Sequence, residues 1–244
     1  MADAETVEIR DQLAEIDWWH SIPITEEVMT DGWIPYSTHK RKDVFIPEDL
    51  SGKRVLDVGS WDAYYAIEAE RRGADDVVAL DINPDHAKGF EVLKDIIDSD
   101  IDYRIGDIME YEFEDNFDIV ICFGVLHHVD PSTEFLDKLS SLANETLCLE
   151  TNTTPSLLNR SLQYDPSQPR RFEFWRRAID GYADYDAKVP SVKWVKEEVE
   201  KRGFEIEDSD THLGVLLQKK LPFDRYIPVP HRFLPTRYIL RATR

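Results

Sequence analysis

The sequence predicts an α/β fold: a doubly wound, mostly parallel seven-stranded sheet with an antiparallel closing strand. Two observations predict it. Short apolar runs alternate with amphipathic helical segments from residue 53 to residue 150, which is the rhythm of parallel strands joined by helices. The segment Ile119–Phe123 is apolar throughout, as expected of a strand that is buried on both faces. The length of 244 residues suits one such domain with additions.

The individual elements follow from their periodicity and from their end signals. Gly73 and Gly203 each follow a helical pattern and end it. Asn83 and Pro84 are expected to cap and open another helix. The expected strands span residues 53–59, 77–80, 102–105, 117–123 and 146–150, with two closing strands at 204–207 and 213–218. The expected helices span residues 5–16, 63–72, 84–97, 130–143 and 191–202.

Composition divides the chain into three parts. Residues 1–50 are expected to form a helical and aromatic segment, whose Trp-Trp-His run is either a lid over a ligand or a simple hydrophobic staple. Residues 51–220 form the main domain, with an arginine-rich insertion at 152–188 that could clamp an anionic acceptor. Residues 221–244 form a basic aromatic tail with five arginines and one acid. That tail is expected either to lie on an anionic surface or to pack on the acidic body.

The charge balance limits the class of partner. There are 49 acidic residues against 29 basic ones, for a net charge of −20. This composition is typical of halophilic-type proteins with an acidic, solvated surface. It disfavours a nucleic-acid partner such as tRNA, although the screening length at molar salt is only about 3 Å. We therefore expect a small-molecule or glycan acceptor.

The apolar runs and the cysteines bear on the compartment. No stretch of 18 apolar residues occurs, so no transmembrane helix is expected. Cys122 and Cys148 both lie in apolar runs, which predicts buried thiols, with neither a disulfide nor a metal site. We expect a cytoplasmic protein, with peripheral contact to the inner membrane face through residues 221–244 as its one form of membrane association.

Residues with chemical potential follow the ends of four expected strands, where ligands bind in doubly wound sheets. They are Asp57, Gly59, Ser60 and Trp61, then Asp81 and Ile82, then Asp107 and Ile108, and finally Phe123 and Gly124. A carboxylate after the second strand can accept hydrogen bonds from both hydroxyls of a ribose, and an acid with an apolar neighbour after the third can hold an adenine. Each acid alone is also a common turn cap. The ordered set is what indicates an adenosyl cofactor.

This ordered set resembles class I S-adenosylmethionine (SAM)-dependent methyltransferases. More narrowly, it resembles the family typified by the tRNA wobble-uridine (carboxy)methyltransferase. The motifs are WWHSI from residue 18, GKRVLDVGSWDA from 52, EAERRGA from 68, FGVLHH from 123 and LET from 149. The resemblance implies a Rossmann-like fold and methyl transfer. It also implies SAM held by Asp57, Gly59, Asp81 and Asp107, with backbone groups near Phe123 and Gly124.

Two departures from the family pattern affect what the resemblance implies. Trp61 and Ala63 stand where the first loop usually has glycines, which leaves a catalytically silent SAM-binding interaction module as an alternative. His127 stands where the tRNA enzyme of the family has a tyrosine that helps to hold the carboxylate of carboxy-SAM. Plain SAM is therefore the expected cofactor.

Three residues are candidates for the chemistry. His127 and His128 follow the fourth strand, and either can act as a base where the acceptor must lose a proton; alternatively, one merely caps a helix or packs on the sheet. Glu150 ends the fifth strand and could hold a substrate hydroxyl, unless it is solvated. We predict a SAM-dependent methyltransferase acting on an oxygen or nitrogen of a small molecule or glycan, such as an acidic lipid-linked sugar. A tRNA wobble-uridine methyltransferase and the silent module are the alternatives.

Overall fold

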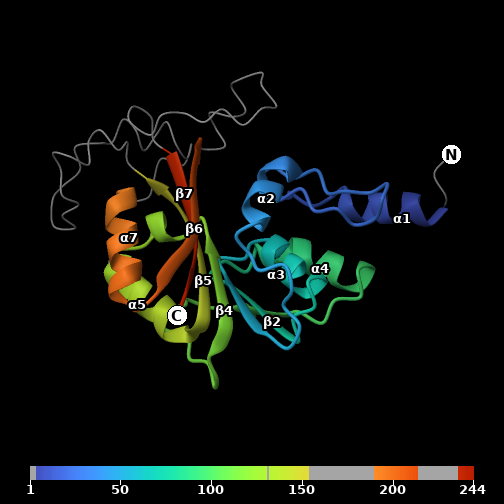
Figure 1. Ribbon diagram of the computed structural model, residues 1–244. Coiled ribbons are helices and arrows are strands. Elements are labelled where there is room, and N and C mark those ends of the chain that lie inside the picture. Colours follow the sequence, from blue (N-terminus) through green and yellow to red (C-terminus); the bar gives the residue numbers. More distant parts are fainter. Residues whose placement is uncertain (1–3, 131, 154–189, 214–235) are drawn as a thin grey trace. The chain divides into compact units, whose positions relative to one another are not determined.

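The computed structural model describes residues 4–130, 132–153, 190–213 and 236–244 (Figure 1). The strands are β1 (Arg54–Val58), β2 (Asp76–Asp81), β3 (Asp102–Ile105), β4 (Phe117–Phe123), β5 (Ala143–Thr153), β6 (Glu205–Leu213) and β7 (Thr236–Thr243). The helices are α1 (Ala4–Leu13), α2 (Tyr36–Asp43), α3 (Tyr64–Arg71), α4 (Ala87–Ile96), α5 (Ser132–Leu142) and α7 (Val192–Lys201), with a 3₁₀ turn η1 (Leu126–His128).

The seven strands are hydrogen-bonded in the order β3-β2-β1-β4-β5-β7-β6. β1 pairs with β2 and β4 in parallel, and β2 pairs with β3 in parallel. β7 is antiparallel to both β5 and β6. The predicted mostly parallel sheet with antiparallel closure is therefore confirmed.

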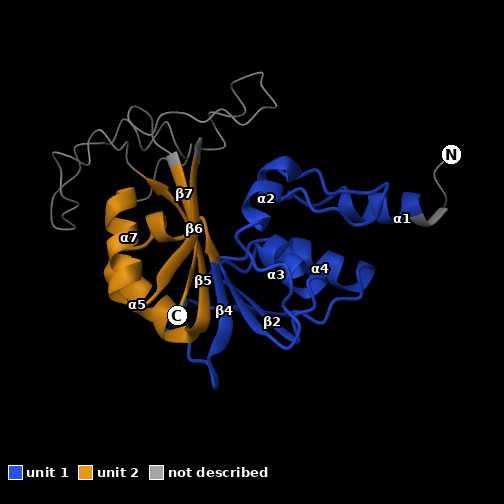
Figure 2. Cartoon of the chain, viewed as in Figure 1, with its two compact units in different colours: residues 1–121 blue, residues 122–244 orange. Residues whose placement is uncertain are grey.

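The chain divides into two compact units, residues 1–121 and residues 122–244 (Figure 2). In the first, β1 is flanked on both edges, with Val55 opposite both Val77 and Ile119. Helix α3 packs on β1 and β2. The fully buried side chains Leu56, Val78 and Val120 form the centre of this core. The neighbouring strand β4 is buried on both faces over Ile119–Phe123, which is why the sequence shows that segment as an unbroken apolar run.

In the second unit, α5 packs on β5, and α7 packs on β6 and on α5. Helix α7 begins where Ser191 caps it, because the Ser191 side chain accepts a hydrogen bond from the backbone N–H of Trp194. Cys122 and Cys148 are both buried, as predicted. The insertion at 152–188 lies outside the described residues apart from Asn152 and Thr153, which end β5.

The structure corrects the expected start of the third helix. Asn83 is not its N-cap: α4 begins at Ala87, after a turn. The Asn83 side chain instead accepts a hydrogen bond from the backbone N–H of Asp85 (3.0 Å), which closes that turn. Asn side chains favour such local bonds over a helix cap when a turn precedes the helix.

The closing strands also differ from the prediction. β6 continues to Leu213, and the predicted strand at 213–218 lies otherwise outside the described residues. The last strand is β7, formed by residues that composition had placed in the basic tail. Its position between β5 and β6 makes residues 236–243 part of the sheet.

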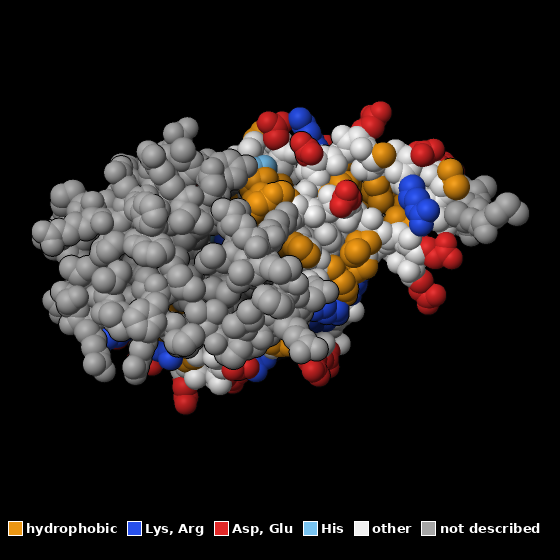
Figure 3. Space-filling view, turned by 90° about the horizontal axis from the view of Figure 1, so that it is seen from above, with side chains coloured by type: hydrophobic (Ala, Val, Ile, Leu, Met, Phe, Trp, Pro, Cys, Tyr) orange, Lys and Arg blue, Asp and Glu red, His pale blue; other side chains and the backbone are white. Residues whose placement is uncertain are grey.

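Three of the five tail arginines contact the body of the second unit. Arg237 pairs with Glu150 (2.9 Å), and Arg241 pairs with Glu207 (3.2 Å). Arg244 donates to the Ser140 carbonyl (2.6 Å) and lies over the Phe204 ring. These three arginines therefore pack on the body, which was the second of the two alternatives for the tail. Residues 221–235 lie outside the described part of the chain. No helix among the described residues is long and apolar enough to cross a membrane. Acidic side chains are spread over the described surface seen in Figure 3.

Candidate active site

The loop after β1 carries three residues with left-handed backbone. Gly59 has φ +74°, Trp61 φ +52° and Ala63 φ +68°. This region costs residues other than glycine roughly 1–2 kcal/mol each. The backbone thus follows a path suited to glycine, although tryptophan and alanine occupy two of the positions.

Hydrogen bonds on both sides of Trp61 hold this conformation. Its backbone N–H donates to Oδ2 of Asp81 (2.9 Å), and its carbonyl accepts from the Tyr103 hydroxyl (2.5 Å). Both partners come from neighbouring strands, β2 and β3. The sheet therefore holds the loop at the end of β2. The role of Tyr103 could not be predicted from the sequence, because only the fold brings this residue next to Trp61.

Asp57 at the end of β1 is joined to Ser60 of the loop. Both are buried, and the Ser60 hydroxyl donates to the Asp57 carboxylate (2.5 Å). Burial raises the pKa of Asp57 to about 6, against the lowering effects of the Ser60 hydrogen bond and of nearby His20. This pair therefore places a buried, titratable carboxylate next to the loop.

The Asp81 carboxylate ends β2 and accepts three hydrogen bonds. Oδ1 accepts from the backbone N–H of Asn83 (2.9 Å) and contacts Nδ1 of His86 (2.9 Å), while Oδ2 accepts from Trp61. Burial works to raise the pKa of Asp81, but the bonds from His86, Asn83 and Trp61 outweigh it and hold that pKa below its ordinary value. A carboxylate offers about four acceptor sites. One acceptor site on Oδ2 therefore remains for a hydroxyl of a diol. Oδ1 could accept from a second hydroxyl only if the His86 side chain moved away.

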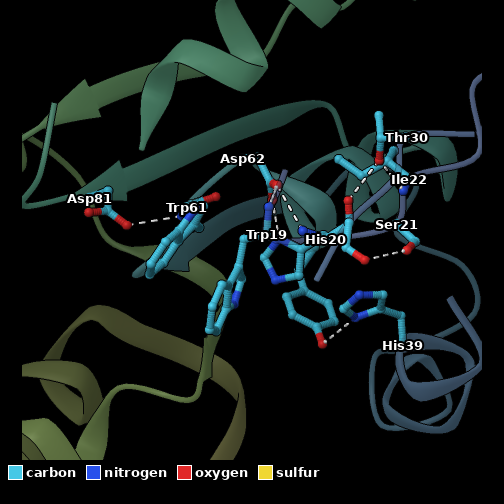
Figure 4. Close-up of polar contacts among 12 residues, drawn as sticks. Trp19, His20, Ser21, Ile22, Thr30, His39, Trp61, Asp62 and Asp81 are labelled. Atoms are coloured by element: carbon cyan, nitrogen blue, oxygen red, sulfur yellow. Dashed lines mark hydrogen bonds and ion pairs between the residues drawn. The ribbon is translucent and has the colours of Figure 1, made fainter. Parts of the chain in front are cut away.

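Four rings stack beside this carboxylate. Trp33 stacks on Trp19 (centroids 4.8 Å apart), Trp19 on Trp61 (4.5 Å) and Trp61 on His86 (3.6 Å). Figure 4 shows Trp19 and Trp61 side by side next to Asp81. The half-buried Trp61 ring is thus held between the N-terminal segment and the turn after β2.

The residues predicted to lie near an adenine differ in their exposure. Ile82, directly after Asp81, is 65% exposed, whereas Ile108 is buried. The Asp107 side chain caps a turn by accepting from the backbone N–H of Met109 (2.9 Å), as its turn-cap alternative describes. Ile105 at the end of β3, which sequence reasoning did not single out, is 44% exposed.

These residues fit an adenosyl group. Exposed apolar side chains could cover an aromatic base, and the neighbouring ionised carboxylate could bind ribose hydroxyls. The left-handed loop beside them allows the backbone to approach a ligand closely.

The N-terminal segment is tied to the loop by Asp62. Oδ2 of Asp62 accepts from the backbone N–H groups of Trp19 (2.8 Å) and His20 (2.9 Å), and Oδ1 contacts Nδ1 of His20. Trp18 behaves differently: it is buried, its indole N–H donates to the Leu13 carbonyl (3.0 Å), and its ring lies against Gly89 of α4. Trp18 is the hydrophobic staple, while Trp19 and His20 lie against the loop.

In the second unit, β4 ends at a constrained turn. Gly124 has φ +86°, and its N–H donates to the Glu150 carbonyl (2.9 Å). The Glu150 side chain is fully buried and accepts from Nη1 of Arg237 at 3.0 and 2.9 Å. The structure brings these three residues together, and Arg237 is a partner that sequence reasoning did not connect with Glu150.

The two histidines after β4 have different environments. His127 is 1% exposed, and its Nδ1 accepts from the backbone N–H of Asn152 (3.3 Å), with the Thr151 hydroxyl also 3.3 Å away. His128 is exposed, with its ring 4.1 Å from that of His127. His127 thus joins η1 to β5, and only His128 is open to solvent. The buried Phe123 precedes this turn.

Comparison with known proteins identifies relatives of the sequence. A protein family described as methyltransferase domain matches residues 32–209. The tRNA U34 carboxymethyltransferase of Sulfurimonas denitrificans is 30% identical over 92 residues, which cover 37% of this chain and 31% of that protein. The corresponding protein of Pseudomonas fluorescens is 29% identical over 170 residues, covering 62% and 52%. The mitochondrial ubiquinone biosynthesis O-methyltransferase of Schizosaccharomyces pombe is 32% identical over 93 residues, covering 37% and 34%.

The chain spans about a third to a half of the length of these curated relatives. Solved structures share its fold at low identity. The N-terminal domain of EvdMO1 with SAH bound superimposes with a TM-score of 0.66 at 16% identity, covering 100% of this chain and 99% of that one. Magnesium protoporphyrin IX methyltransferase of Synechocystis PCC 6803, with bound SAH, gives 0.59 at 16% identity, covering 88% and 90%. The Rossmann-like fold that the sequence implied is thereby confirmed.

Proposed function

Since this chain belongs to the methyltransferase-domain family, we propose that it transfers the methyl group of SAM to an oxygen, or a nitrogen, of a small molecule or glycan. An acidic sugar on a lipid carrier is the acceptor we favour. The observation that carries the proposal is the left-handed loop of Gly59, Trp61 and Ala63, hydrogen-bonded to Asp81. The loop also makes a catalytically silent module less favoured, because Trp61 and Ala63 keep the left-handed backbone that glycines would adopt there.

The residues divide the work of binding. Asp81 would hold the ribose, Ile82 and Ile105 would cover the adenine, and the loop backbone over Asp57 would face the methionine part. SAM supplies an electrophilic methyl group on a sulfonium. In-line transfer then depends on positioning and on exclusion of water, which the Trp19–Trp61 stack would provide.

Charge and fold likeness support a small-molecule or glycan acceptor. The net charge of −20 opposes binding to a polyanion. One neighbour in fold, the N-terminal domain of EvdMO1, was crystallised with SAH and D-fucose. Three tail arginines, which would otherwise attract an anionic surface, are engaged within the second unit.

A tRNA wobble uridine is the second candidate, favoured by the similarity to tRNA U34 carboxymethyltransferases. Plain SAM remains our proposed cofactor in either case. His127, at the place of the carboxylate-holding tyrosine, is 1% exposed and uses Nδ1 as an acceptor. A histidine at this place lacks the phenolic hydroxyl with which the tyrosine of the tRNA enzyme helps to hold that carboxylate.

A labelling experiment tests the proposal and separates the two acceptors. The protein is incubated with methyl-labelled SAM and an extract of cells of its source, with and without ribonuclease treatment. We expect labelled product that survives ribonuclease and partitions with sugars or lipids. Label that disappears with ribonuclease would establish the tRNA candidate instead. A protein that neither binds SAM nor forms S-adenosylhomocysteine would refute methyl transfer altogether.

A further inference from the structure

Asp62 and His20 form a buried carboxylate–imidazole pair that cofactor binding does not require. Asp62 is 2% exposed and His20 is 7% exposed. Oδ2 of Asp62 is used by two backbone N–H groups, which leaves Oδ1 for Nδ1 of His20. A carboxylate behind Nδ1 keeps the proton on that nitrogen and leaves the lone pair of the neutral imidazole on Nε2.

The other ring nitrogen is available. Within the described part of the chain, no hydrogen bond to Nε2 of His20 is observed, and the residue keeps 7% of its surface exposed. The ring cannot swing freely, because the His39, Tyr64 and Tyr65 rings lie around it at centroid distances of 4.8, 5.8 and 5.8 Å.

Titratable groups surround this imidazole. Asp62 contacts Nδ1, and the rings of His39 of α2 and of Tyr64 and Tyr65 of α3 lie around it. Burial is the largest cause that drives the pKa of His39 far below its ordinary range, so His39 stays neutral.

We propose that His20, oriented by Asp62, is the general base of the reaction, and that the acceptor atom is a hydroxyl oxygen. This inference rests on the proposed methyl transfer. The hydroxyl proton passes to Nε2 of His20 while the oxygen forms its bond to the methyl carbon. The electrons of the breaking carbon–sulfur bond remain on sulfur, which yields S-adenosylhomocysteine, and the Asp62 carboxylate stabilises the imidazolium until water takes the proton.

The proposal selects among acceptor classes. A carboxylate acceptor carries no proton to remove and needs no base, whereas a sugar or phenol hydroxyl does. The expected product is therefore a methyl ether and not a methyl ester. His127, by contrast, uses Nδ1 to accept from the backbone N–H of Asn152.

Three variants test the pair. His20→Gln keeps a donor toward Asp62 but removes the base, and Asp62→Asn keeps an acceptor for the backbone but offers an N–H to Nδ1. His39→Gln is the matched control, because it removes a second buried histidine of the same cluster. The acceptor pool is the ribonuclease-treated extract, and label transfer is measured at saturating SAM from pH 5 to pH 9, beside SAM affinity by calorimetry.

We expect His20→Gln to slow label transfer at least about 100-fold, the lower range for a lost general base, with SAM affinity within about threefold of wild type. His39→Gln should transfer label at close to the wild-type rate. Label in the wild-type product should survive mild alkali, which cleaves methyl esters but not ethers. Unchanged transfer by His20→Gln, or alkali-labile label, overturns the assignment while leaving methyl transfer intact.

The position of the proton on His20 can also be measured without SAM. Imidazole ¹⁵N chemical shifts of the wild-type protein should show His20 with its proton on Nδ1 at neutral pH, and Asp62→Asn should move that proton to Nε2. A wild-type His20 protonated on Nε2 at neutral pH contradicts the proposal, whether or not the variants fold. Failure of the wild type to bind SAM refutes the proposed function instead.

Discussion

At the residue scale, Asp81 gives a direct test of the cofactor site. Asp81→Ala removes the carboxylate that would accept the ribose hydroxyls. It should weaken SAM binding by about 1.5–3 kcal/mol, the range for hydrogen bonds to a charged group. Calorimetry on the folded variant measures this. Asp85→Ala is the matched control, because Asp85 is exposed and its carboxylate pairs with Lys88. Equal SAM affinity of the Asp81 variant and wild type would place the site elsewhere.

The residues around Trp61 show what could and could not be predicted from the sequence. The acids at the strand ends were predictable, because parallel strands align their carboxyl ends at one edge of a sheet. Asp57 and Asp81 accordingly lie at the loop, and burial of both is observed. The stacking of Trp61 between Trp19 and His86 was not predictable, because it depends on residues up to 42 positions away in sequence that only the fold brings together. The same is true of the Asp62–His20 pair.

Two elements without a clear apolar pattern were missed, whereas elements with one were predicted well. β4 has the predicted bounds, because its apolar run matches its burial. Helix α2 was missed, since its sequence YSTHKRKD has no apolar stripe. It buries polar residues, His39 and Asp43 among them. β7 was missed because its arginines read as a basic tail, although each described one has a partner in the second unit.

The contact between α2 and α3 should make stability depend on pH. The Tyr64 hydroxyl donates to the Asp43 carboxylate (3.0 Å). Burial, followed by nearby Glu68, raises the pKa of Asp43 to about 6. The folded state then binds more protons than the unfolded state between about pH 4 and pH 6, so the free energy of unfolding falls as pH rises through that window.

Asp43→Asn should remove this loss, because the amide oxygen still accepts from Tyr64 without a buried charge. We expect a gain of about 1–3 kcal/mol at pH 7 and little change at pH 4, from a pKa shift of about two units. Urea unfolding at both pH values measures it. A residual slope should persist from Asp57, whose pKa is also raised to about 6. A gain that is equal at pH 4 and pH 7 would contradict this origin.

The Glu150–Arg237 pair is the second element-scale test, because it joins β5 to β7. Glu150 is fully buried, so Arg237→Met leaves a buried carboxylate without its guanidinium. Loss of one partner of a buried pair costs about 3–5 kcal/mol, whereas replacing both with apolar side chains is often close to neutral. The double variant with Glu150→Met should therefore unfold at higher urea concentration than the Arg237 single variant. If the single variant matches wild type, β7 does not depend on this pair.

For the whole molecule, net charge is the property that sequence alone defines. With a net charge of −20, the acidic side chains repel one another in the folded state, and this repulsion destabilises that state where salt does not screen it. The screening length falls from about 10 Å at 0.1 M salt to about 3 Å at 1 M. Repulsion between like charges on the surface is therefore screened far more strongly at 1 M salt than at 0.1 M.

We therefore expect the melting temperature to rise between 0.1 M and 1 M KCl. Each kcal/mol gained corresponds to roughly 2–4 °C for a chain of this size. General salting effects on apolar burial would produce a similar rise, so a charge variant is needed to separate them. Asp95→Asn, Asp98→Asn, Glu110→Gln and Glu114→Gln together remove exposed charges that lie away from the candidate site. If repulsion is the cause, this variant melts higher than wild type at 0.1 M KCl and gains less from added salt. An identical salt response in the two proteins would assign the rise to burial instead, and the acidic surface would then carry no stability cost for salt to relieve.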